Sequence, residues 1–179
     1  PSFASELFDF AKTIHEEVDT VGLIDAVLRI NESQCEVLFR KLWRYYKGDL
    51  KGRRVAVWGA AFKAGTPSVR NSVVHPLLGA LWGQGCHTVV FDPQAMPSLR
   101  QMYPDEPLLS FSSSVTQSVQ GVDAIALVTA WDEFRSPDFT ALGQTMKSAI
   151  IFDGRNLYDP DLMEAQGFQY FGIGRGESI

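Results

Sequence analysis

The sequence has few cysteines, no excess of basic residues and no long apolar run. Only Cys35 and Cys86 occur among 179 residues, without C-x-x-C spacing. A disulfide framework or a structural zinc site is therefore not expected, and we predict a reducing, cytoplasmic location. Sixteen Lys and Arg stand against 21 Asp and Glu, a formal net charge of −5, which argues against a nucleic-acid binder with a basic patch. No run approaches the ~20 apolar residues of a membrane span.

Residue types that carry catalytic chemistry are scattered along the chain. His15, His75 and His87 stand far apart, and the serines at 112–114 lack the G-x-S-x-G context of a nucleophile. We therefore predict no catalytic residue and no metal site in this chain. It begins at Pro1 without an initiator Met or a charged and apolar leader, so we expect a fragment of a longer protein that is not secreted.

Residues 3–47 contain no proline and one glycine, a composition that favours helices. After Thr20, a predicted N-cap, apolar residues recur at helical spacing and predict a helix from about 21 to 46. Its stripe consists of Leu23, Val27, Ile30, Gln34, Leu38 and Leu42. Such a stripe requires a partner. Packing against the following domain and a homodimer interface are the two alternatives, and we favour the homodimer.

Beyond residue 48 short apolar strands alternate with helices. We predict strands near 54–58, 87–91, 124–129, 149–153 and 168–173, and helices near 73–84, 96–102, 114–120, 138–146 and 160–166. Near-continuous apolar strands are typical of burial on both faces. The alternation predicts an α/β fold, a Rossmann-like doubly wound parallel sheet preceded by a long-helix segment. We place the domain boundary between 1–47 and 48–179.

The loop after the first predicted strand, residues 59–66, is the first candidate ligand site, because ligands of such sheets bind at the carboxyl ends of the strands. It matches the dinucleotide fingerprint G-x-G-x-x-G at Gly59 only, since Ala61 and Ala64 replace the next two glycines. An independent NAD site in this domain is therefore not expected. Asp92, which ends the second strand, could bind a ribose or act as a helix cap or turn residue.

Cationic side chains follow two of the predicted strands. Lys63 and Arg70 lie in and after the first loop, and Arg155 follows the strand that ends at Asp153. Three cations at one sheet edge would suit a diphosphate, with the mobile Lys charge and the planar Arg fork complementing each other. The alternatives are solvated side chains for Lys63 and Arg70, and an ion pair with Asp153 or Asp159 for Arg155.

Several ordered motifs resemble one known family, the UDP-glucose/GDP-mannose dehydrogenases. The motifs are Phe62-Lys63-Ala64-Gly65-Thr66, Val69-Arg70-Asn71-Ser72, Phe91-Asp92-Pro93, Thr129–Phe134, Asp153-Gly154-Arg155-Asn156 and Gly172–Arg175. In this order they resemble the C-terminal domain of the family. Residues 1–47 resemble the end of its central helical dimerisation domain.

The resemblance implies an enzyme that oxidises the C6 hydroxyl of a nucleotide sugar to a carboxylate in two NAD-dependent steps. NAD and the catalytic Cys would belong mainly to a part that precedes Pro1, and this chain would cover the UDP- or GDP-hexose and be inactive alone. By motif position, Phe62, Lys63 and Arg155 would contact the nucleotide sugar, and Arg70 would approach NAD. A free-standing nucleotide-sugar-binding or interaction module without oxidoreductase activity is the alternative.

The sequence departs from the family's pattern at four positions. Pro67 and Ser68 stand where acidic residues are common, and Asn71 stands where Glu or Asp is common. Cys35 takes the place of an Arg that reaches the neighbouring subunit's site in many members. These departures leave open which sugar nucleotide is bound.

Overall fold

The computed structural model describes residues 25–27, 30 and 36–175, and the chain divides into two compact units, 1–37 and 38–179. Residues 25–27 and 30 are helical, Glu36 lies in a turn, and α3 spans Val37–Tyr45. The helix predicted over 21–46 is thus confirmed near its end but wrong in being continuous, since it is interrupted at Glu36. Thr20, Leu23, Gln34 and Cys35 lie outside the described residues. The boundary at 47/48 between family domains stays a prediction.

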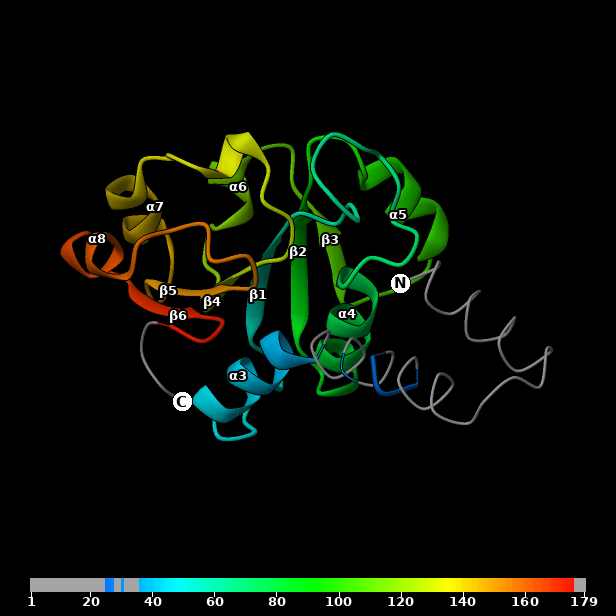
Figure 1. The fold of residues 1–179 in the computed structure, drawn as a ribbon, viewed down its shortest axis with the longest axis horizontal. Helices are drawn as coiled ribbons and strands as arrows, with labels where there is room; N and C mark the ends of the chain where they lie inside the picture. Colours follow the sequence, from blue (N-terminus) through cyan, green and yellow to red (C-terminus); the bar gives the residue numbers. More distant parts are fainter. Residues whose placement is uncertain (1–24, 28–29, 31–35, 176–179) are drawn as a thin grey trace. The chain divides into compact units, whose positions relative to one another are not determined.

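Six strands form one sheet in the order β3-β2-β1-β4-β5-β6, and every neighbouring pair is parallel (Figure 1). They are β1 (Arg54–Trp58), β2 (His87–Phe91), β3 (Leu109–Phe111), β4 (Ala124–Leu127), β5 (Ile150–Asp153) and β6 (Gln169–Gly172). This order is the doubly wound one, so the predicted α/β fold is confirmed. The edge strand β3 was not predicted, because it is three residues long and only partly buried.

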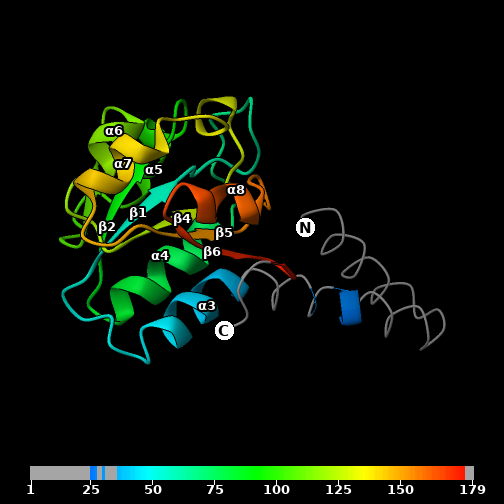
Figure 2. The same ribbon diagram turned by 90° about the vertical axis from the view of Figure 1, so that its left-hand side faces the viewer.

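Helices cover both faces of the sheet, with α3 and α4 on one side and α6 and α7 on the other (Figure 2). The predicted helices are all present, as α4 (Val74–Gly83), α5 (Met96–Met102), α6 (Val115–Ser118), α7 (Phe139–Thr145) and α8 (Pro160–Ala165), with a 3₁₀ turn η1 (Asp132–Phe134). Ser114, Asp138 and Asp159 cap α6, α7 and α8 by accepting from backbone N–H groups. Within the described residues, none of the helices has the length and apolarity that a membrane crossing requires.

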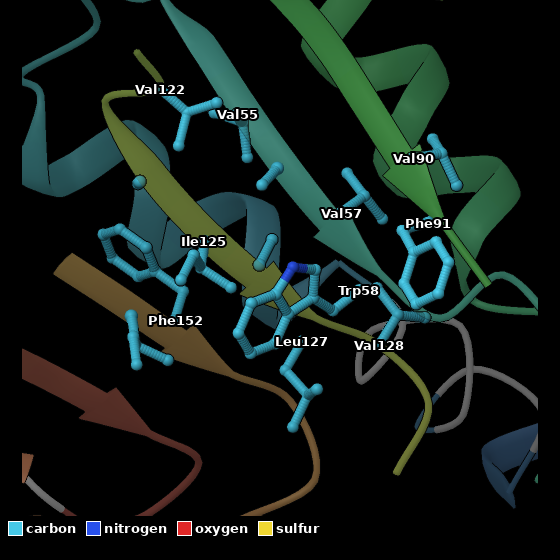
Figure 3. Close-up of a cluster of buried hydrophobic side chains, with 14 of the residues drawn as sticks. Val55, Val57, Trp58, Val90, Phe91, Val122, Ile125, Leu127, Val128 and Phe152 are labelled. Atoms are coloured by element: carbon cyan, nitrogen blue, oxygen red, sulfur yellow. The ribbon is translucent and has the colours of Figure 1, made fainter. Parts of the chain in front are cut away.

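The strands β1, β4 and β5 in the interior of the sheet contribute many of the buried side chains of the core (Figure 3). Trp58 is fully buried, stacks on Phe134 at 5.3 Å between ring centroids, and donates its indole N–H to Ser118 Oγ at 2.8 Å. Phe152 stacks on Phe171 of β6 at 5.0 Å. Burial on both faces leaves the ends of the strands as the places where polar side chains gather.

The C-terminal end of the predicted helical stripe packs against the sheet domain. Leu38 and Leu42 of α3 are 3% and 0% exposed, and the Tyr45 ring lies on the core aromatic residues of β5 and β6. Packing against the following domain is therefore the outcome for this end of the stripe. Val27 and Ile30 are 43% and 59% exposed, and the homodimer interface stays a prediction.

Candidate functional site

β1 ends in a turn that requires glycine. Gly59 has φ +86°, and a Cβ atom there would lie 2.5 Å from Thr129 Cβ and 2.7 Å from Thr129 N. Thr129 Oγ1 also donates to Ala61 O at 2.6 Å. The loop after β1 is thus held tightly against the segment that follows β4, at the carboxyl edge of the sheet.

The buried side chain of Asp92 connects the loops of this edge by hydrogen bonds. Its carboxylate is fully buried and accepts five hydrogen bonds. The donors are the backbone N–H groups of Ala60 (2.7 Å), Ala61 (3.0 Å), Gln94 (2.9 Å) and Ala95 (2.7 Å) and the indole of Trp131 (2.9 Å). Of the alternatives for Asp92, the structure supports the turn residue, because Gln94 N and Ala95 N donate to its Oδ1. The ribose alternative does not fit, because the carboxylate is fully buried and both of its oxygens already accept hydrogen bonds from the protein.

Asp92 also changes what the first loop can bind. In dinucleotide-binding sheets the amides of this loop receive a pyrophosphate. Here the N–H groups of Ala60 and Ala61 already donate to Asp92. An anion at this loop must therefore be held by side chains rather than by these amides.

The predicted cations of the first loop are available for such a contact. Lys63 and Arg70 are exposed, and neither side chain has an ion pair or hydrogen bond within the described residues. Phe62 is 37% exposed, and its N–H donates to Ser68 O at 2.9 Å, which closes the loop. His75 Nε2 lies 2.6 Å from Val69 O and fixes the backbone next to Arg70.

A second buried carboxylate shapes the loop after β5. Asp153 is fully buried and accepts from the N–H groups of Arg155 (2.8 Å), Leu157 (2.7 Å) and Tyr158 (3.2 Å). The Tyr170 hydroxyl of β6 donates to the same carboxylate at 2.9 Å. Burial, and then the Asp153 charge, raise the pKa of Tyr158 and of Tyr170 well above the usual range. Both phenols therefore stay protonated at neutral pH.

Arg155 lies across the end of β4. Its Nε donates to Val128 O at 2.5 Å, and Val128 N in turn donates to Trp58 O of β1 at 2.8 Å. The guanidinium is thereby held at the end of β4, the strand that lies between β5 and β1, and the loop after β1 carries Lys63. Among the described residues, Arg155 forms no ion pair with Asp153 or Asp159, so that alternative is wrong. Both Nη atoms lack a partner in this part of the chain.

Three residues whose side chains hold the loops of this edge together were not predicted from the sequence. Asn156 has φ 54°, and its side-chain amide exchanges two 2.8 Å hydrogen bonds with the backbone of Ile173 after β6. Arg175 Nη2 donates to Asn156 O and, at 2.7 Å, to Tyr158 O. Trp131 is the third, as the Asp92 partner. The recurring motifs at 129–134, 153–156 and 172–175 were the available signal, because all three residues lie in them.

Comparison with known proteins identifies the family of the chain. The family profile for the UDP-glucose/GDP-mannose dehydrogenase family, UDP binding domain, matches residues 56–160. The chain belongs to this family. It is 40% identical over 156 residues to UDP-glucose 6-dehydrogenase of Pseudomonas aeruginosa, a match that covers 86% of this chain and 34% of that protein. With UDP-glucose 6-dehydrogenase of Rhizobium meliloti the identity is 30% over 173 residues, 97% of this chain and 39% of that protein.

Solved structures of the family have the same fold. A UDP-glucose dehydrogenase from Pyrobaculum islandicum superposes with a TM-score of 0.77 at 25% identity, over 94% of this chain and 35% of that one. A UDP-D-ManNAc dehydrogenase from Pyrococcus horikoshii gives 0.68 at 27% identity, over 93% and 36%. The chain thus spans about a third of the length of these relatives.

Proposed function

We propose that this chain is the C-terminal part of an NAD-dependent nucleotide-sugar 6-dehydrogenase that converts UDP-glucose to UDP-glucuronate in two oxidation steps. Its own task in this proposal is to cover the nucleotide sugar at the carboxyl edge of the sheet. The observation that carries the proposal is the match of a UDP-binding domain to residues 56–160. Within this domain the edge presents cations that form no ion pair with any described residue. A cytoplasmic location and a homodimer belong to the same proposal.

The diphosphate would be recognised by side chains from two loops. Lys63 is exposed and unpaired within the described residues, and Arg155 is fixed through Nε while both Nη atoms remain available. An ammonium and a guanidinium fork complement each other on one pyrophosphate. Phe62, the residue before Lys63, is 37% exposed and would contact the base or sugar. These residues bind and orient the substrate, and no catalytic residue is assigned to this chain.

NAD would be bound mainly by a different part of the longer protein. The domain fits poorly as a dinucleotide site, because its first loop retains only Gly59 of the fingerprint and the amides of Ala60 and Ala61 are taken by Asp92. When bound, NAD accepts the hydride that leaves C6 of the sugar. The exposed Arg70 would approach NAD from this domain.

The proposal is tested with the purified 179-residue chain and with the longer protein. The chain alone is expected to form no NADH from UDP-glucose and NAD, whereas the longer protein is expected to form it. Turnover by the chain alone would overturn the assignment of the catalytic Cys and NAD to the other part. Binding of UDP-glucose without NADH formation by the longer protein would favour the binding-module alternative.

A further inference from the structure

A hollow lies at the opposite edge of the sheet, where β1, β2 and β3 begin. It has a volume of about 360 Å³ and is lined by Gly52, Arg54, His87 and the segment 107–110. A volume of this size is in the range of small-molecule sites. Because these residues precede or open their strands, the hollow is separated from the candidate nucleotide-sugar edge by the length of the sheet.

The walls of this pocket are fixed by backbone hydrogen bonds. Gly52 N donates to Gly85 O at 2.9 Å, and His87 N donates to Arg53 O at 2.8 Å. On the other side, Thr88 N donates to Leu108 O at 2.7 Å. The three chain segments that line the pocket are therefore tied to one another by their backbones.

An arginine and a histidine side chain line this pocket. Arg54 and His87 are register partners in the parallel pair β1–β2, so their side chains emerge on the same face of the sheet. Both residues are exposed, and neither side chain forms a hydrogen bond or ion pair within the described residues. The site thus offers an arginine fork and an imidazole with no internal acceptor.

The neighbouring charges show that this lack of partners is local. Arg53 pairs with Asp49 at 2.9 Å and with Asp123 at 3.6 Å. Glu106, the acid closest in sequence to the 107–110 wall, accepts from Leu108 N at 2.9 Å and so closes its own turn. Asp123 also accepts from the Arg54 backbone N–H at 2.8 Å, so Asp123 and Glu106 are both engaged by other groups, while the Arg54 guanidinium forms no ion pair within the described residues.

We propose that this pocket binds a phosphate monoester of a small organic molecule. The Arg54 guanidinium matches a phosphate bidentately, and His87 supplies a second donor to the same dianion. The volume exceeds what a single phosphate fills, and Pro107, Leu108 and Leu109 provide an apolar wall for the organic group. The site does not depend on the proposed dehydrogenase function.

The test is an amide NMR titration of the 179-residue chain with ribose 5-phosphate and, separately, with inorganic phosphate and malate. Saturable shifts are expected at residues 52–54, 87 and 107–110, with tighter binding of the monoester than of the other two. Arg54→Gln and His87→Gln are expected to weaken binding, the former by about tenfold or more. Arg44→Gln, which removes an exposed charge from α3, is the matched control and is expected to bind as the wild type does.

Three results would overturn the proposal. Shifts that do not saturate would remove the site. Equal affinity for inorganic phosphate would remove the organic group from the assignment, and tighter malate binding would replace the phosphate by a carboxylate. Thermal melting of each variant shows whether it is folded, and His87→Gln keeps the test valid if Arg54→Gln unfolds.

Discussion

Asp92 follows β2 and Asp153 ends β5, and both carboxylates are fully buried beneath a loop of the same sheet edge. Asp92 accepts from three separate segments, namely the loop after β1, the turn that leads into α5 and Trp131 after β4. Asp153 accepts mainly from its own loop, with Tyr170 of β6 as the outside partner. The same residue type at equivalent strand ends therefore links strands in one case and shapes a single loop in the other.

Loss of the Asp92 charge is expected to have the largest effect. Asp92→Asn turns one acceptor into a donor that faces buried N–H groups, so the free energy of unfolding should fall by about 3 kcal/mol or more. Urea denaturation measures this change. Asp105→Asn, at an exposed aspartate, is the control and should stay within about 0.5 kcal/mol of the wild type. Equal effects of the two variants would contradict the linking role of Asp92.

A smaller and more local effect is expected at the second carboxylate. Asp153→Asn should lower the free energy of unfolding by about 2 kcal/mol, because it disturbs one loop and a single inter-strand contact. Amide hydrogen exchange should speed up at Leu157 and Tyr158 and remain slow at Ala60 and Ala61. Faster exchange in both loops would show that Asp153 also links strands.

Tyr170→Phe isolates the outside partner of Asp153. It removes the 2.9 Å hydroxyl donor and leaves the three backbone donors, so a loss of about 1 kcal/mol in unfolding free energy is expected. Denaturant midpoints measure it. A loss as large as that of Asp153→Asn would mean that the β6 contact, rather than the loop amides, dominates this carboxylate.

The smallest expected effect is a loss of stability at alkaline pH that arises at the Asp153 loop and not at the Asp92 loop. The pKa of Tyr170 is raised above its unfolded value near 10, so the unfolded chain loses this proton first. The contribution of Tyr170 to stability is complete below about pH 10 and falls as the pH rises above it. The partners of Asp92 are amides and an indole, which do not titrate in this range. The unfolding free energy measured by urea denaturation should therefore fall less between about pH 9 and about pH 11 in Tyr170→Phe than in the wild type, and an equal fall in both would contradict the account.

The parts of the fold that were predictable from the sequence are those that depend on apolar runs and on helix-capping residues. Strands such as β1 and β4 are continuous apolar segments, and the capped helices between them begin close to the predicted residues. β3 was not predicted, because it is a short, partly buried edge strand of three residues, Leu109, Ser110 and Phe111. The interruption of the helix at Glu36 was not predicted, because the helical spacing of apolar residues continues across this position in the sequence.

At the site, sequence could place the cations but not their partners. Lys63 and Arg155 follow strands, so the edge on which they lie was predictable from topology. The contact of Arg155 with Val128 O joins residues of different strands, and spacing along the chain holds no information on it. The same holds for Trp131 on Asp92, and for the Arg54 and His87 pocket, which depends on the register of β1 against β2.

The central claim is that Lys63 and Arg155 together hold the nucleotide sugar at the carboxyl edge. Its most direct test is a calorimetric titration of UDP-glucose into the longer dehydrogenase to which we assign this chain, with Lys63→Ala, Arg155→Ala and the control Arg44→Ala, each checked by thermal melting. The two site variants should weaken binding by about 1.5–3 kcal/mol with little change in melting, and the control should bind as the wild type does. Wild-type affinity in both Lys63→Ala and Arg155→Ala would contradict the account and leave the domain as a structural cap.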